Sequence, residues 1–104
     1  MSRKDNEGKV RLLRSLAHHI HRKTPAEEAM TACIEAEGRG GRHRQWRQAG
    51  EILASDGFVP ALVAGQLVGD EAAAVLEIVA ASGDHRNLAA AITALADYLE
   101  QQAD

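Results

Sequence analysis

Apolar residues recur along this chain at the spacing of a helix face, not in the strict alternation of a half-buried strand. Short breaks that contain Gly, Pro or Asp separate one apolar stripe from the next. The pattern predicts an all-α protein, a compact antiparallel bundle of about six helices. The first stripe follows the i, i+3, i+4 rule: Val10, Leu13, Leu16, Ala17 and Ile20.

The breaks also predict where each helix begins. Thr24 is expected to cap the second helix, with Pro25 at its first position and Glu27 completing a capping box. Asp70 is expected to cap the fifth helix. The polar start of the chain predicts a flexible segment over 1–9, followed by a single domain over 10–104. The predicted helices cover about residues 10–23, 25–37, 42–55, 61–66, 71–81 and 85–102.

Composition predicts a core of small side chains. Hydrophobic residues make up 45% of the chain but aromatic residues only 3%, which lets helices pack closely. Trp46 shares a stripe with Leu53, and Cys33 lies in the stripe of the second helix, so we expect both Trp46 and Cys33 to be buried. The fifth helix is expected to turn four residues inward: Val75, Leu76, Val79 and Ala80.

The expected compartment follows from what the sequence lacks. A single cysteine rules out an internal disulfide and favours a reducing environment. The chain has no run of about 18 apolar residues, and its first residues lack the apolar stretch of a signal peptide. We therefore expect a cytoplasmic protein.

Charge is divided unequally between the two halves of the chain. Residues 1–50 hold 11 Lys and Arg against 6 Asp and Glu, a balance of +5, whereas residues 51–104 hold one Arg against 9 acids, a balance of −8. Two interpretations are open. The halves attract each other within the fold, or they form two surfaces for two different partners.

The cations gather on the first predicted helix and around Trp46. An aromatic residue among arginines is typical of nucleic-acid binding, but Trp46 is expected in the core and the chain is acidic overall, with a pI near 5.9. An acidic protein surface, or anionic lipid headgroups, is the favoured partner. Arg42 and Arg44 are the residues most expected to face solvent. The full set of candidate partner-binding residues is Arg11, Arg14, Arg39, Arg42, Arg44 and Arg47.

Metal binding and catalysis find little support in the sequence. His18 and His21 share a helix face, but a zinc site needs a third or fourth ligand, and Arg14 and Arg22 flank the pair. The glutamates have no His, Ser or Cys partner at a spacing that suggests acid–base or nucleophilic catalysis. We expect no metal, no cofactor and no enzymatic activity.

Three segments of the chain carry recognisable motifs. They are Leu13-x-x-Leu16-Ala17 with Thr24-Pro25-x-x-x-Ala29, Leu53-x-x-x-Gly57 with Ala61-Leu62, and Ile78-Val79-Ala80-Ala81-Ser82-Gly83 with Asn87-Leu88 and Leu95-Ala96-Asp97-Tyr98-Leu99-Glu100. Over about residues 10–102, these motifs resemble the cytoplasmic domain of the type II secretion F-protein family, the inner-membrane platform proteins of type II secretion and type IV pilus assembly. In the closing turn the chain reads Ser82-Gly83-Asp84-His85-Arg86, where the family often has Gly-Glu, so a contact or bound ion that depends on that Glu is not carried over.

The resemblance implies a six-helix docking module at the cytoplasmic face of the inner membrane. Its partners would be the assembly ATPase and neighbouring platform subunits, and no catalytic residue carries over. Family members commonly have membrane helices attached, so the chain is expected to be a fragment or a stand-alone relative. The alternatives are an unrelated small helical adaptor or regulator and, less favoured, a nucleic-acid-binding protein that uses residues 39–47. We expect a monomer or a weak homodimer.

Overall fold

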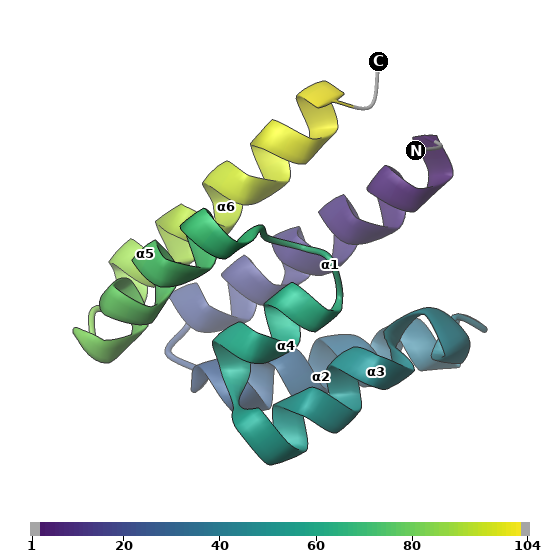
Figure 1. Cartoon of the computed structure of the whole chain (residues 1–104), viewed down its shortest axis with the longest axis horizontal. Coiled ribbons are helices and arrows are strands. Elements are labelled where there is room, and N and C mark those ends of the chain that lie inside the picture. Colours follow the sequence, from purple (N-terminus) through teal and green to yellow (C-terminus); the bar gives the residue numbers. More distant parts are fainter. Residues whose placement is uncertain (1–2, 103–104) are drawn as a thin grey trace.

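The structure is a computed structural model that describes residues 3–102. These residues form helices without any strand, which confirms the all-α prediction (Figure 1). The helices are α1 (Arg3–His21), α2 (Ala26–Arg39), α3 (His43–Asp56), α4 (Phe58–Ala64), α5 (Asp70–Ala81) and α6 (His85–Gln102).

Helix α1 is the central element of the bundle. It runs antiparallel to α6, so the two ends of the chain lie at the same end of the molecule (Figure 1). Its other side packs on α2, which continues through α3 to α4. Burying each large apolar side chain contributes about 1.5–3 kcal/mol, and α1 supplies four of the eight largest fully buried ones. These eight are Leu12, Leu13, Leu16, Ile20, Met30, Trp46, Leu62 and Ile92.

The start of α1 differs from the sequence prediction. Residues 3–9, which we expected in a flexible segment over 1–9, form the first turns of α1; residues 1 and 2 lie outside the described residues. Asn6 is buried, and its Nδ2 donates to the carbonyl oxygen of Leu99 on α6 at 3.3 Å. Lys9 is buried as well. The physical reason is that α6 is long enough to cover these turns, which their polar sequence does not reveal.

The predicted cap at Thr24 is wrong. Helix α2 begins at Ala26 with Pro25 in the N-cap position, and no side chain caps it. The backbone N–H of Thr24 instead donates to the carbonyl oxygen of His19 at 3.0 Å, while that of Lys23 donates to Ile20 at 2.9 Å. Together with the positive φ of Lys23 (74°), these bonds form a Schellman motif. Thr24 therefore belongs to the end of α1.

Asp70 is also not a cap, whereas Asp84 is. Asp70 is the first residue of α5, and Gly69 before it makes no side-chain cap bond. The Oδ1 atom of Asp84 accepts hydrogen bonds from the backbone N–H groups of Arg86 (3.1 Å) and Asn87 (3.0 Å) at the start of α6. An acceptor in this position satisfies donors that a helix leaves unpaired in its first turn.

Two further details correct the predicted elements. Helix α4 begins at Phe58 rather than at residue 61, with Pro60 in its first turn, where proline is tolerated because no backbone donor is needed. In α5, Leu76 is buried and Val79 and Ala80 are partly buried, but Val75 lies on the exposed side. The burial predicted for Trp46 and Cys33 is confirmed.

The caps predict unequal effects of two similar substitutions. Asp84→Ala should lower the free energy of unfolding by about 1 kcal/mol, because two backbone donors of α6 lose their acceptor. Thr24→Ala should change it by less than about 0.5 kcal/mol, because no side-chain cap exists there. Urea unfolding followed by circular dichroism measures both. Equal losses in the two variants would contradict this assignment of the caps.

Candidate interaction site on α2 and α3

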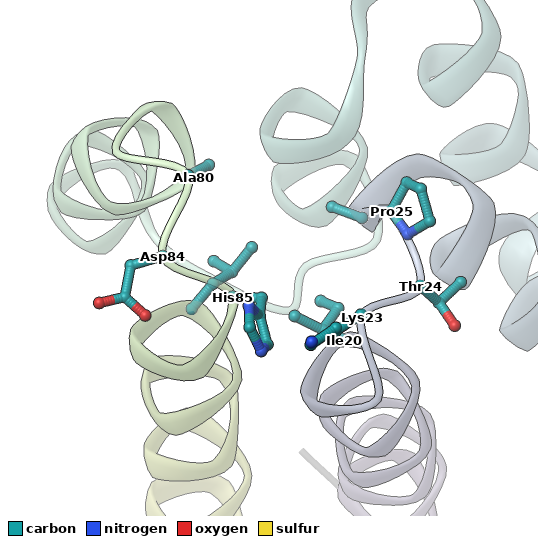
Figure 2. A pocket seen from close by; sticks show the side chains of 10 residues that line it. Ile20, Lys23, Thr24, Pro25, Ala80, Asp84 and His85 are labelled. Atoms are coloured by element: carbon teal, nitrogen blue, oxygen red, sulfur yellow. The ribbon is translucent and has the colours of Figure 1, made fainter.

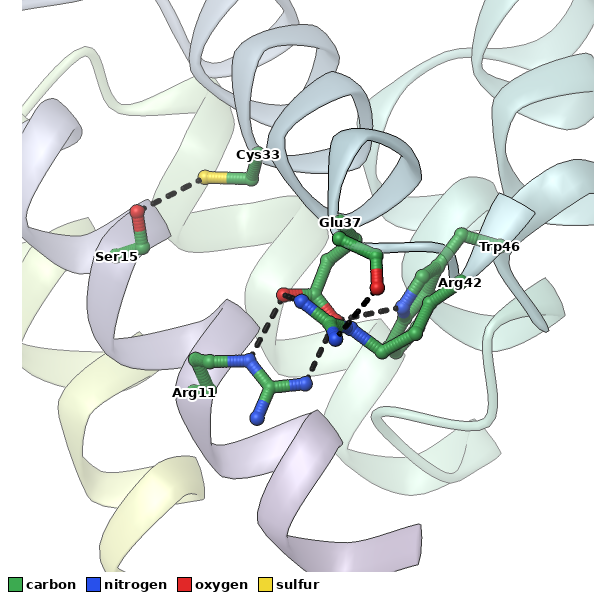
Figure 3. A network of polar contacts seen from close by, with 7 residues as sticks. Arg11, Ser15, Cys33, Glu37, Arg42 and Trp46 are labelled. Atoms are coloured by element: carbon green, nitrogen blue, oxygen red, sulfur yellow. Dashed lines mark hydrogen bonds and ion pairs between the residues drawn. The ribbon is translucent and has the colours of Figure 1, made fainter.

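A buried carboxylate joins the first three helices. Glu37 on α2 has a side chain only 6% exposed, and it accepts hydrogen bonds from three residues (Figure 3). Arg11 on α1 binds it through two nitrogens, Nε to Oε2 and Nη2 to Oε1, each at 2.9 Å. Arg42, just before α3, donates from Nε to Oε1 at 2.9 Å. The indole Nε1 of Trp46 donates to the same oxygen at 3.1 Å.

These contacts keep Glu37 ionised. The hydrogen bonds from Arg11 are the largest influence, and together with those from Arg42 and Trp46 they outweigh burial, which favours the neutral acid. The pKa of Glu37 falls to about 2. A carboxylate with two guanidinium partners and an indole donor is well suited to hold three helices in one geometry.

The network changes the roles expected of two arginines. Arg42 was expected to be free to meet a partner, but its guanidinium is bound to Glu37 and to the carbonyl oxygen of Gly40 (3.1 Å). Arg11 is bound to Glu37 in the same way. Both side chains stay partly open to water, at 49% for Arg11 and 38% for Arg42. Their first role is structural, because each joins its own segment to α2.

The four other candidate arginines lie in different surroundings. Arg14 forms ion pairs with Asp97, at 2.9 Å, and Glu100 on α6, away from the remaining set. Arg47 lies 3.6 Å from Glu51 on the exposed face of α3. Within the described part of the chain, Arg39 and Arg44 have no ion-pair partner, and both are exposed, as expected for Arg44.

Arg39, Arg44 and Arg47 line a groove between α2 and α3 of about 1060 Å³. The rim also carries His43 and two acids, Glu35 and Glu51. Trp46 contributes to the wall, and the floor is apolar and made largely of small residues: Ile34, Gly38, Gly50 and Ala54. The structure thus brings together three of the six arginines that the sequence suggested as partner-binding residues, and these three line the apolar groove.

Gly50 keeps the α2–α3 groove open. A Cβ atom at Gly50 would meet only Cγ2 of Ile34, at 3.9 Å, which is an ordinary contact. Packing therefore does not require glycine here, although glycine inside a helix costs about 1 kcal/mol relative to alanine. Gly38 is different, because a Cβ there would lie 2.9 Å from Nδ1 of His43. The missing side chain at Gly50 leaves backbone as the groove floor.

Sequence reasoning missed the burial of Glu37, although one signal was present. Glu37 lies four residues after Cys33 and seven after Met30, so it continues the apolar stripe of α2. A buried charge in that position needs oppositely charged partners. Arg42 follows α2 in the sequence, and Arg11 lies beside α2 in the structure. Periodicity alone could not say which arginines they would be.

A second hollow, of about 370 Å³, lies where the α1–α2 turn meets the α5–α6 turn (Figure 2). Lys23 and Thr24 border it on one side, and Asp84 and His85 on the other. Asp84 already caps α6 with its Oδ1 atom. The rest of the lining is largely apolar: Ile20, Pro25, Ala26, Ala80, Gly83 and Leu88.

Two features of the described residues bear on metal and thiol chemistry. No three His, Cys, Asp or Glu side chains among them are arranged to hold a metal ion. The thiol of Cys33 is buried and donates to Oγ of Ser15 at 3.5 Å, and burial raises the pKa of this thiol (Figure 3). It is therefore a poor nucleophile. Each described helix is also too short or too polar to cross a membrane.

The low pKa of Glu37 predicts a pH-dependent loss of stability. Because the pKa of Glu37 is lower in the folded than in the unfolded protein, its ionisation stabilises the fold at pH values above the unfolded pKa, near 4.3. This contribution is lost as the pH falls toward the folded pKa of about 2. Glu37→Gln should therefore cost roughly 3 kcal/mol at neutral pH. The difference from wild type should shrink below about pH 5. Denaturant unfolding across this pH range measures it.

Glu35→Gln is the matched control, because Glu35 is an exposed glutamate on the same helix. It should leave both the stability and its pH profile close to those of wild type. A Glu37→Gln variant as stable as wild type at neutral pH would show that the network contributes no net stability.

Comparison with known proteins adds no relative. No family model, no curated protein and no solved structure matches this chain.

Proposed function

We propose that this chain is a non-catalytic protein-interaction module that binds a partner protein in the α2–α3 groove. The observation that carries the proposal is the combination of an apolar floor with Arg39 and Arg44 on the rim, neither of which has an ion-pair partner among the described residues. Protein interfaces typically have an apolar centre and a polar rim, and arginine is enriched in them.

The surroundings of the groove support this proposal. Trp46 forms part of its wall and is held by the hydrogen bond to Glu37, so the wall does not need to reorganise when a partner binds. Exposed cations on the rim would speed the approach of an acidic partner. The nucleic-acid alternative is less well supported, because Trp46 is 1% exposed and cannot stack on a base.

The family resemblance suggests which proteins to test. If it holds, the partner is a secretion ATPase or a neighbouring platform subunit at the cytoplasmic face of the inner membrane. The motifs quoted above and the six-helix architecture support this part of the proposal. An unrelated helical adaptor would use the same groove, so the proposed binding surface does not depend on the family.

Filling the groove should abolish binding without harming the fold. In Gly50→Leu, the Cβ atom makes only an ordinary contact with Ile34, and the side chain should extend over the groove floor. Helix propensity should raise the stability by up to about 1 kcal/mol. The immobilised wild-type and variant proteins are exposed to a lysate of the native cell, and the retained proteins are quantified by mass spectrometry. A partner of the groove is retained by the wild type and lost with the variant.

Gln48→Leu is the control, because it adds the same apolar side chain to an exposed position of α3 outside the groove. It should retain the partner as the wild type does. If Gly50→Leu retains the same proteins as the wild type, the partner does not bind in this groove, and the proposal is contradicted.

A further inference from the structure

Helix α5 carries an exposed apolar stripe. Val75 is 58% exposed and Ile78 is 73% exposed, which is unusual for large hydrophobic side chains. Ala74 and Ala81 are also exposed, and residues 74, 75, 78 and 81 share one helix face. The opposite face of α5 packs on the bundle through Leu76. The stripe itself has no partner within the described part of the chain.

The stripe is acidic at its edges. Glu71 lies one turn before Val75 on the same face, and Glu77 lies beside Ile78. With Asp70 at its start, α5 has three acids and no Lys, Arg or His over its whole length. It is thus an amphipathic helix that displays apolar side chains and negative charge together.

The α2–α3 groove has the complementary properties. Its floor is apolar, and Arg39 and Arg44 stand exposed on its rim, while the acid Glu51 lies near Arg47. Glu35 is the other acid of the lining. Helices commonly bind in such grooves through apolar residues at i, i+3, i+4 and i+7, with charges at the edges. The stripe of α5 has a similar arrangement, because its apolar residues lie at i, i+1, i+4 and i+7 on one helix face.

Helix α5 cannot occupy the groove of its own chain. Among the described helices it packs only against α4 and α6, and it lies on the other side of the bundle from α2 and α3 (Figure 1). A contact between stripe and groove must therefore join two molecules.

We propose that the α5 stripe of one copy docks in the α2–α3 groove of a second copy. The self-docking rests on the proposed function, because it uses the same groove. It identifies the α5 stripe of a second copy as the occupant of that groove. The contact is head-to-tail, so the first copy keeps its groove free and the second keeps its stripe free, and short chains or a closed ring result. An outside partner has to displace the stripe. Two large side chains make a small interface, so half-dissociation is expected at roughly 0.1 mM.

A charge-swap experiment tests this docking. The stripe variant carries Glu71→Lys with Glu77→Lys, and the groove variant carries Arg39→Glu with Arg44→Glu. Sedimentation velocity is measured from about 0.01 to about 1 mM protein, at about 20 mM and about 500 mM salt. Wild type should associate with rising concentration, more weakly at high salt. Each variant alone should associate at least about tenfold more weakly, because like charges then face each other.

An equal mixture of the two variants should associate again at low salt. In the mixture, every stripe meets a groove of opposite charge. Ile78→Ser should weaken wild-type association without unfolding the protein, because the side chain is exposed. The control for the stripe variant carries Glu28→Lys with Asp56→Lys. It changes the net charge by the same amount as the stripe variant, on exposed residues outside both surfaces, and it should associate as the wild type does.

Three results would overturn the proposal: a wild type that stays monomeric at the highest concentration and low salt, a stripe variant that associates normally, or a mixture that stays monomeric. The Gly50→Leu variant separates the two proposals. If it loses an outside protein while wild type is monomeric, the interaction function stands and the self-docking fails. If the mixture of charge-swapped variants associates but no outside protein depends on the groove, the self-docking stands and the interaction with an outside partner fails.

Discussion

The buried carboxylate of Glu37 is the interaction on which the arrangement of α1, α2 and α3 depends. Removing an ionised group from water costs several kcal/mol unless close partners replace its hydration. Here Arg11 and Arg42 supply those partners while their own guanidinium groups remain partly in water, so only one of the three charges is fully desolvated. Trp46 gains an acceptor for an indole N–H that would otherwise be buried without one.

The groove is a consequence of this network. Trp46 is fixed by Glu37, and its ring forms one part of the groove wall. Arg42 is drawn toward α2, which leaves Arg39 and Arg44 as rim arginines without an ion-pair partner among the described residues, while Arg47 lies near Glu51. A preorganised surface of this kind loses less conformational entropy on binding than a flexible one. Gly50 keeps the floor open and thereby gives up some helix stability.

The division of charge along the sequence has more than one outcome in the fold. Arg14 pairs with acids of α6, so the basic and acidic halves do attract each other at this point. Arg11 and Arg42 are instead neutralised within their own half by Glu37. Two further surfaces are exposed: a basic rim on α2 and α3 and an acidic, apolar stripe on α5. Those two surfaces underlie both proposals made above.

The sequence by itself determined the number of helices, most of their boundaries to within a few residues, and the burial of Trp46 and Cys33. These features follow from local periodicity and from turn residues, which act over one or two turns of chain. Only the tertiary structure decided that α1 starts at Arg3, that Glu37 is buried, that Arg42 is bound and that Val75 is exposed. The start of α1, the burial of Glu37 and the exposure of Val75 depend on which distant segment packs alongside, as α6 does along α1, and local periodicity does not identify that segment. The bond from Arg42 depends on the turn between α2 and α3, which brings Arg42 back onto Glu37.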